Sequence, residues 1–231
     1  MLDEQFRSGF DRGVRPLGVR LRRLGVTADH LTVVGMVMAA ACAVSVALGQ
    51  LQLGLLFLIL CGLPDALDGA VAKAAGTASP RGSFFDSVAD RVSDALLFGG
   101  VAWYLADTRG GVIVMVPVGV LALSMLISYE RAKAESMGFS AKGGIMERAE
   151  RMILLGLGLL FEVLLLPVLW VMLALTAFTA TQRFVRVWRQ ASAPRPAAAD
   201  RRAARRRAAR RRTSRSSRSW QALRSNRTRR P

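Results

Sequence analysis

Four aspartates recur at helical spacing in a chain that is otherwise strongly apolar. Asp65 and Asp68 are three residues apart, Asp86 and Asp90 are four apart, and Asp94 continues the second series. Residues at these spacings share one face of an α-helix, so each set would present its carboxylates to one side. Ionised carboxylates within a membrane are costly and persist when they are paired or bind cations. The basic residues nearby in the sequence are few: Lys73, Arg81 and Arg91.

This excess of carboxylates over nearby cations favours a divalent metal site. Oxygen ligands without Cys or His select Mg²⁺ or Mn²⁺ rather than Zn²⁺. Two such ions about 4 Å apart can hold a pyrophosphate and stabilise displacement at phosphorus. The sequence therefore predicts a two-ion site for chemistry at a diphosphate. Its predicted ligands are Asp65, Asp68, Asp86 and Asp90.

Small residues accompany the aspartates. Gly69, Ala70, Ala72 and Gly82 fall on the same predicted helix faces and leave room for a ligand to approach the backbone. The alternative is that small residues at these positions let two membrane helices pack closely. Helix packing alone would not account for the four carboxylates.

The elements that must position these carboxylates are apolar helices. The chain has 231 residues, of which 52% are hydrophobic, with a mean hydropathy of +0.31 and a formal net charge of +17. Uncharged apolar runs of about 18 residues or more are candidates for membrane crossing. We predict an all-α integral membrane fold with six transmembrane helices, at about 31–50, 52–75, 83–106, 111–133, 148–166 and 168–188.

The basic residues are distributed unevenly around these predicted spans. If the N-terminus is cytoplasmic, all 33 Lys and Arg residues except Arg109 fall on the cytoplasmic side. The positive-inside rule then puts both termini in the cytoplasm, together with the helix ends that carry the aspartates. We therefore expect a multi-pass protein of the cell membrane whose active site faces the cytoplasm.

Two flanking segments differ from the region 26–190, which we expect to be the catalytic domain. Residues 1–25 have apolar residues on one helical face and arginines on the other, a pattern typical of an amphipathic helix in the membrane interface. Residues 191–231 are rich in Ala, Arg and Ser and predict a disordered tail. The tail is either simply solvated or attracted to anionic lipids, at about 1 kcal/mol per basic residue near the surface. Trp220 is its one aromatic residue, so nucleic-acid binding is not expected.

A second charged cluster lies at the predicted cytoplasmic ends of the last three spans. Several cations beside the metal site would suit an acceptor that is itself anionic, such as a phosphorylated polyol, whereas a neutral acceptor would not need them. The alternative is positive-inside anchoring, but anchoring does not require the glutamates interleaved with these cations. The predicted acceptor-binding residues are Arg131, Lys133, Arg148, Arg151 and Arg183.

The aspartates belong to a longer motif that resembles the signature of the CDP-alcohol phosphatidyltransferase family. The family usually has Arg where this chain has Lys73, which keeps the charge but not the bidentate contact to phosphate. The motif reads Asp65-x2-Asp68-Gly69-x2-Ala72-Lys73-x8-Gly82-x3-Asp86-x3-Asp90.

The resemblance implies a role for each matched residue. It implies metal binding by the four aspartates, with Asp90 also the catalytic base, and a homodimer with a cytoplasm-facing cavity open laterally to lipid. Asp29 and Thr32 match the nucleotide-contacting helix start, although Asp29 could also be the N-cap of the first span. The implied residues for binding the CDP-activated lipid are Asp29, Thr32, Gly69, Ala72, Lys73, Ser79 and Gly82.

The basic residues of the last three predicted spans resemble those of one group within the family. Ser128–Glu135, the Glu-Arg-x-Glu-Arg segment at 147–151 and Arg183 are similar to the actinobacterial phosphatidylinositol phosphate synthases. Arg131 and Lys133 are exchanged relative to the usual order. The resemblance implies transfer of the phosphatidyl group from CDP-diacylglycerol to inositol phosphate, with CMP released, by two-metal catalysis with Mg²⁺ or Mn²⁺.

Two other functions remain open from the sequence. A phosphatidylglycerophosphate synthase is the nearest, because glycerol 3-phosphate is also anionic. A different class is a non-enzymatic membrane anchor that displays the basic tail, although this function leaves the aspartate spacing unexplained.

Overall fold

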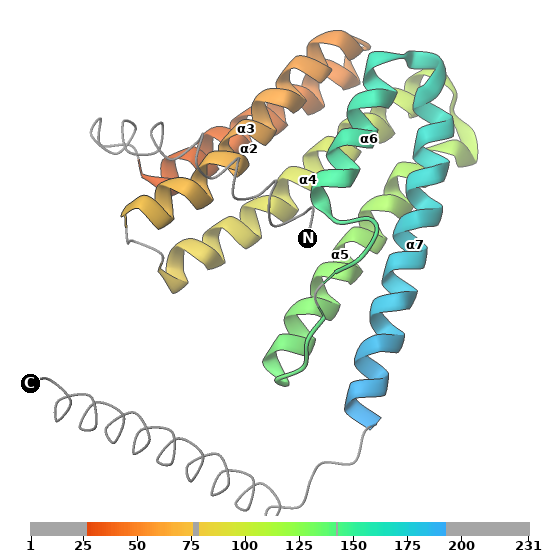
Figure 1. Cartoon of the computed structure of the whole chain (residues 1–231). Helices are drawn as coiled ribbons and strands as arrows, with labels where there is room; N and C mark the ends of the chain where they lie inside the picture. Colours follow the sequence, from red (N-terminus) through yellow and green to blue (C-terminus); the bar gives the residue numbers. More distant parts are fainter. Residues whose placement is uncertain (1–26, 76–78, 142, 193–231) are drawn as a thin grey trace, which may run out of the picture. The chain divides into compact units, whose positions relative to one another are not determined.

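Figure 1 shows the computed structural model of the chain, which describes residues 27–75, 79–141 and 143–192. Within α3, the side chains of residues 64–75 are outside the description. The predicted interfacial helix at 1–25 lies outside the described residues, as does the predicted tail beyond residue 192. The contacts divide the chain into two units, Met1–Trp188 and Arg189–Pro231, and the fold described below belongs to the first.

The described residues form helices and contain no strand, which confirms the predicted all-α fold. Several helix ends differ from those predicted, and a short 3₁₀ helix precedes the fourth long helix. In chain order the elements are α2 (Ala28–Ala47), α3 (Leu51–Ala75), α4 (Pro80–Thr108), η1 (Gly111–Val114), α5 (Met115–Ser136), α6 (Arg148–Leu160) and α7 (Glu162–Ser192).

The first described helix begins three residues earlier than predicted because a capping box fixes its start. The Thr27 side chain accepts from the backbone N–H of His30, and His30 Nδ1 accepts from the backbone N–H of Thr27. These two bonds satisfy donors that a helix N-terminus would otherwise leave free. The alternative interpretation of Asp29 as the N-cap is therefore wrong, and Asp29 lies within the first turn of α2.

The last two helices meet at Phe161. The predicted spans 148–166 and 168–188 had put their boundary at Pro167. Phe161 ends α6 with an extended backbone (φ −126°, ψ 102°), and α7 begins at the next residue. Pro167 lies inside α7, near its start. A proline there removes one i→i−4 hydrogen bond but does not end the helix, so the sequence-based boundary was wrong.

Long-range hydrogen bonds tie together the helix ends farthest from the aspartates. Tyr104 of α4 donates to Glu162 at the start of α7, at 2.8 Å. Gln52 at the start of α3 donates to the carbonyl of Leu160 at the end of α6, at 3.0 Å. These bonds show that α3 and α7 start at the end of the unit where α4 and α6 finish.

The core between the helices is apolar and drawn from all six of them. α2 packs against both α3 and α4, α4 against α5, and α3 against α6. The backbones of α2 and α4 approach closely at Gly100 of α4, where a Cβ would lie 2.6 Å from the carbonyl oxygen of Ala43 in α2. Glycine is required there because any side chain would meet backbone. The central buried residues include Ala39, Cys42, Leu58, Cys61, Leu97, Val101, Val120, Leu155, Leu159, Leu169 and Met172.

Within the described part of the chain, three segments are long and apolar enough to cross a membrane by length and composition. They are Ala28–Ala47, Gly111–Ser136 and Glu162–Ser192. The described apolar part of α3, Leu51–Leu63, is shorter, and α6 has 13 residues. The 29-residue α4 carries three carboxylates of the candidate site, those of Asp86, Asp90 and Asp94.

Candidate functional site

The two predicted pairs of metal ligands lie on α3 and α4. Asp65 and Asp68 are helical residues near the end of α3, and their side chains lie outside the described set. Asp86 and Asp90 lie one turn apart on α4, and both are partly exposed. Among the described residues, no group of three or more His, Cys, Asp or Glu is arranged to hold a metal ion. The described half of the site supplies carboxylate oxygens, which suit Mg²⁺ or Mn²⁺.

Three residues predicted to bind the CDP-activated lipid meet at the start of α4. Ser79 is the N-cap of α4 and accepts from the N–H of Gly82 at 3.0 Å. A Cβ on Gly82 would lie 3.7 Å from Oδ1 of Asp29, so the start of α2 reaches this turn. Arg81 lies 3.8 Å from Asp29. Thr32 is buried one turn along α2 and donates to the carbonyl of Ala28.

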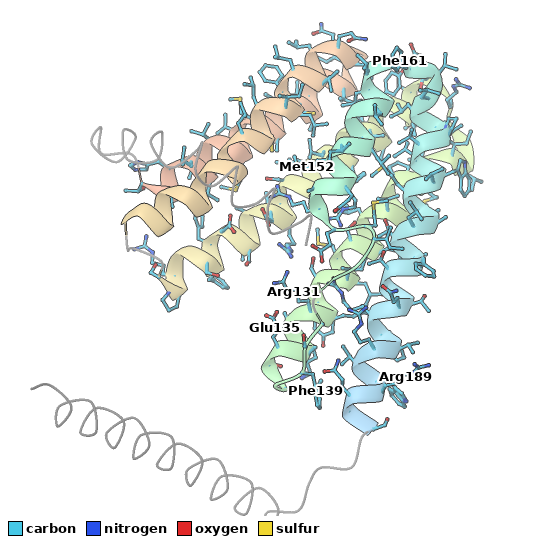
Figure 2. The ribbon with its side chains drawn as sticks, viewed as in Figure 1. Arg131, Glu135, Phe139, Met152, Phe161 and Arg189 are labelled. Atoms are coloured by element: carbon cyan, nitrogen blue, oxygen red, sulfur yellow. The ribbon has the colours of Figure 1, made fainter. Side chains whose placement is uncertain are left out.

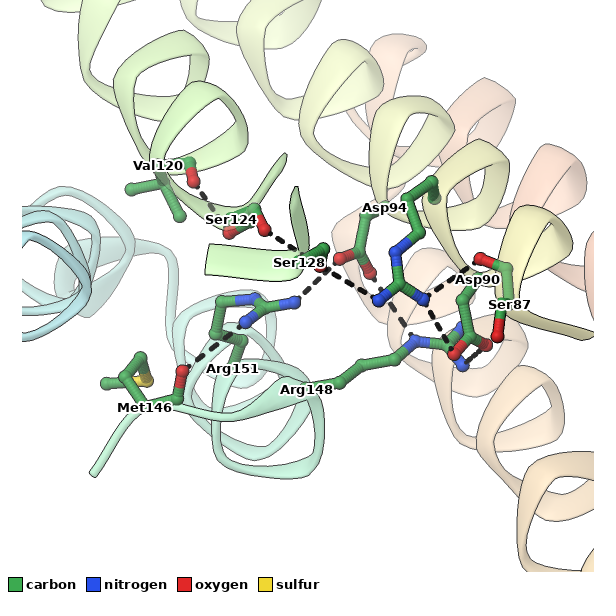
Figure 3. Close-up of polar contacts among 10 residues, drawn as sticks. Ser87, Asp90, Asp94, Val120, Ser124, Ser128, Met146, Arg148 and Arg151 are labelled. Atoms are coloured by element: carbon green, nitrogen blue, oxygen red, sulfur yellow. Dashed lines mark hydrogen bonds and ion pairs between the residues drawn. The ribbon is translucent and has the colours of Figure 1, made fainter. Parts of the chain in front are cut away.

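Asp90, the predicted base, contacts an arginine through each of its carboxylate oxygens. Arg148, the first residue of α6, donates to Oδ1. Arg91 lies 3.2 Å from Oδ2 and also donates to Ser128 of α5 at 2.8 Å. Arg91 also donates to the carbonyl of Ser87. Figure 3 shows Ser87, Asp90, Ser128 and Arg148 together. Asp90 therefore joins α4 to α6, and its neighbour Arg91 joins α4 to α5.

Asp94 forms a second, more deeply buried ion pair one turn further along α4. Nη2 of Arg151 lies 2.7 Å from Oδ2 of Asp94, and the side chains are 6% and 9% exposed. Nε of Arg148 lies 3.5 Å from the other oxygen of Asp94 (Figure 3). Breaking a buried pair by removing one partner typically costs about 3–5 kcal/mol, because the remaining charge is left uncompensated. Two carboxylates of α4 therefore face two arginines of α6.

Arg148 and Arg151 lie near the N-terminus of α6, where cations are unfavourable. They are in its first turn, where the helix dipole disfavours positive charge. Helix N-termini favour anions, and the carboxylates of α4 compensate part of the cost.

Arg183 of α7 is the most buried of the predicted acceptor residues, with a side chain 3% exposed. It donates to the carbonyls of Ile127 (3.0 Å) and Gly143 (3.3 Å), and its Nη2 lies 3.6 Å from Glu147. Its Nε is buried and has no hydrogen-bond partner among the described residues. A buried guanidinium held mainly by carbonyls has capacity for an anion.

The two remaining predicted acceptor residues are exposed on α5. Arg131 pairs with Glu135 at 3.0 Å, one turn along the same helix (Figure 2). Lys133 is also exposed. The structure thus divides the predicted acceptor set into three buried or half-buried arginines and two surface cations.

Asp94, Arg91 and Ser128 are contacts of the site that the sequence prediction missed. Asp94 continued the aspartate face but received no role. Asp94 is four residues from Asp90, and Arg151 is three residues from Arg148. Each spacing puts two charges on one helix face, and this signal could have indicated two parallel ion pairs. No comparable sequence signal pointed to the hydrogen bond of Arg91 with Ser128.

Comparison with known proteins supports the motif. Residues 25–188 match the CDP-alcohol phosphatidyltransferase family. The chain belongs to this family. It is therefore an enzyme, and the non-enzymatic anchor is not supported. Membership in a family of membrane enzymes, together with the three apolar segments, identifies a membrane protein.

Curated proteins with similar sequences include synthases of phosphatidylinositol phosphate and of archaetidylinositol phosphate. The chain is 34% identical over 197 residues to the phosphatidylinositol phosphate synthase of Mycobacterium marinum, covering 81% of this chain and 84% of that protein. It is 36% identical over 193 residues to the archaetidylinositol phosphate synthase of Methanothermobacter thermautotrophicus, covering 80% and 94%.

Solved structures of this phosphatidyltransferase family share the fold. The phosphatidylinositol phosphate synthase of Mycobacterium tuberculosis with CDP-DAG bound matches with a TM-score of 0.71 at 32% identity, over 77% of this chain and 94% of that chain. The same enzyme in complex with manganese and citrate also matches with a TM-score of 0.71, at 31% identity over 76% and 88%.

Proposed function

We propose that this enzyme transfers the phosphatidyl group from CDP-diacylglycerol to a hydroxyl of inositol phosphate, giving phosphatidylinositol phosphate and CMP. The observation that carries the proposal is the contact of Arg148 with Asp90, which sets a predicted phosphate-binding cation against the predicted base. The names of the similar enzymes from Mycobacterium marinum and Mycobacterium tuberculosis support the same acceptor class.

The donor would bind between the start of α2 and the facing ends of α3 and α4. Asp29, Ser79 and Gly82 already lie together there. Thr32 and the α3 residues Gly69, Ala72 and Lys73 complete the proposed donor site. Gly82 leaves room beside Asp29 for a ligand to approach the backbone.

Divalent ions would be held by Asp65, Asp68, Asp86 and Asp90. When bound, two Mg²⁺ or Mn²⁺ ions would neutralise the diphosphate and stabilise charge that develops at phosphorus. The all-oxygen donor set fits such ions. The manganese-bound structure of the similar enzyme supports use of a divalent metal.

The chain's own residues would carry the proton and orient the acceptor. Asp90 would accept the proton of the acceptor hydroxyl while the oxygen of that hydroxyl forms a bond to the β-phosphorus of the donor. The bond from that phosphorus to the bridging oxygen breaks, and CMP leaves. Because Arg148 contacts Asp90, an acceptor phosphate on Arg148 would keep its hydroxyls near the base.

An anionic acceptor fits the buried arginines better than a neutral one does. Arg148, Arg151 and Arg183 lie on α6 and α7, and the Nε atoms of Arg151 and Arg183 have no hydrogen-bond partner among the described residues. Arg131 and Lys133, at the exposed end of α5, would attract the acceptor from solution. Free inositol carries no anionic group for these guanidinium groups to bind.

We also propose a six-span topology and a homodimer in the cell membrane, with the site and both termini in the cytoplasm. All basic residues except Arg109 then face the cytoplasm, as the positive-inside rule requires. Arg109 follows the end of α4, remote from the aspartates. The Arg-rich tail would lie against anionic lipid headgroups.

A direct assay tests the proposed reaction. Purified protein in lipid nanodiscs receives CDP-diacylglycerol, Mg²⁺ and one labelled acceptor at a time: inositol phosphate, glycerol 3-phosphate or inositol. We expect CMP release and a labelled lipid with inositol phosphate. Transfer to glycerol 3-phosphate in its place would contradict the acceptor, and transfer to none of the three would contradict the function.

A further inference from the structure

The proposed reaction gives no role to the most buried carboxylate of the site. Asp94 is 6% exposed as a residue and lies one turn beyond Asp90 on α4. It lies outside the motif that ends at Asp90. Burying an ionised carboxylate is costly, so its retention beside the site requires an explanation.

Asp94 contacts two of the arginines assigned to the acceptor. One oxygen lies 2.7 Å from Nη2 of Arg151, within hydrogen-bond distance. The other lies 3.5 Å from Nε of Arg148, whose Nη1 reaches Asp90. Asp94 therefore holds the guanidinium of Arg151 by a hydrogen bond and lies near Nε of the Arg148 guanidinium.

The geometry of Arg151 shows how it is held. Its Nη1 donates to the carbonyl of Met146 at 3.4 Å, while Nη2 is held by Asp94. Met146 in turn is fixed by a bond from its N–H to Thr179 of α7, at 3.2 Å. Arg151 thus links Asp94 of α4, through the backbone of Met146, to α7, the helix that carries Arg183.

We infer that Asp94 is a positioning residue that holds Arg151 and Arg148 in place for the phosphate of the acceptor. In this role Asp94 would act through the two arginines and would not itself contact the substrate. The inference rests on the proposed function, because it assumes that these arginines bind an anionic acceptor. A planar guanidinium binds phosphate well only when its orientation is fixed, so a displaced guanidinium loses affinity for that group.

The test compares Asp94→Asn and Asp94→Glu with the wild type and with Asp107→Asn, an exposed carboxylate at the far end of α4. Kinetics are measured in nanodiscs for both substrates. We expect Asp94→Asn to raise KM for inositol phosphate about tenfold or more, the effect of losing a hydrogen bond to a charged group. KM for CDP-diacylglycerol and kcat at saturating acceptor should stay unchanged. Asp107→Asn should match the wild type.

If Asp94→Asn does not fold, the positioning role of Asp94 is tested with Asp94→Glu instead. Glutamate retains the charge that balances Arg151 but moves the carboxylate by one methylene. We expect a folded enzyme with KM for inositol phosphate between those of the wild type and Asp94→Asn. An unchanged KM for the acceptor in the folded variant would overturn the inference. A fall in kcat with both KM values unchanged would also overturn it, because that result is expected of an ion pair with a structural role alone.

The wild type separates failure of this inference from failure of the proposed function. A wild type that accepts neither inositol phosphate nor glycerol 3-phosphate contradicts the function and, with it, the role of Asp94. If the wild type prefers glycerol 3-phosphate, the same comparison is made with that acceptor, and an elevated KM there supports the positioning role. An active wild type whose variants keep its acceptor KM contradicts the positioning role alone.

Discussion

Arg148 of α6 donates to the carboxylate of Asp90 on α4. These residues were assigned from the sequence to different tasks, one to the acceptor phosphate and the other to removal of the acceptor proton. Their contact makes the two tasks adjacent. An acceptor phosphate that binds Arg148 would therefore compete with Asp90 for the guanidinium, and its hydroxyls would lie near the base.

Asp90→Asn should abolish most activity while leaving the fold intact. The amide cannot accept the acceptor proton as a carboxylate does, and general-base catalysis typically contributes about 10²–10⁴-fold. CMP release in nanodiscs measures the loss, and size-exclusion chromatography checks the fold. Deletion of residues 193–231 is the comparison and should retain transfer. Full activity of Asp90→Asn would refute its assignment as base.

Arg148→Gln should weaken use of the acceptor, with kcat/KM for inositol phosphate lower by about 10–100-fold. Arg148→Lys should be intermediate, because lysine keeps the charge but lacks the planar fork. Steady-state kinetics with each substrate varied in turn measures the effect. Arg109→Gln, an exposed arginine beyond the end of α4, is the matched control and should be neutral. Equal effects on donor and acceptor KM would argue against a specific phosphate contact.

Removal of divalent ions should stop the reaction reversibly. A chelator should eliminate CMP release, and added Mg²⁺ or Mn²⁺ should restore it, because the diphosphate charge needs a counter-ion. Asp86→Asn should raise the ion concentration needed for half-maximal activity. A metal titration of the variant beside the wild type measures this shift. Undiminished turnover in chelator would exclude the metal site.

Gly100→Ala should destabilise the protein, whereas Gly99→Ala should not. A Cβ at Gly100 would lie 2.6 Å from the Ala43 carbonyl oxygen, but a Cβ at Gly99 would meet no atom within 4 Å. Both substitutions gain helix propensity about equally, so their difference reports packing. Overpacking costs about 1–3 kcal/mol. Thermal unfolding in detergent compares them, and equal melting temperatures would contradict the close contact of α2 with α4.

Local spacing was sufficient to predict the all-helical fold and the common face of Asp90 and Asp94 on α4. The distance between Asp86 and Asp90 along the chain fixes their relation because helix periodicity is a property of the backbone itself. The start of α2 was missed because a capping box depends on side-chain geometry at Thr27 and His30. The break at Phe161 was missed because the extended backbone of one residue within an apolar helical pattern changes no periodicity in the sequence.

The sequence by itself determined the family motif, the apolar helices and the set of charges available to the site. Only the tertiary structure decided which charges meet. Arg151 and Asp94 are separated by 57 positions, and their contact depends on how α6 packs beside α4. Pairings across helices follow from the burial of the apolar faces around them, a property of the whole fold that no local spacing contains.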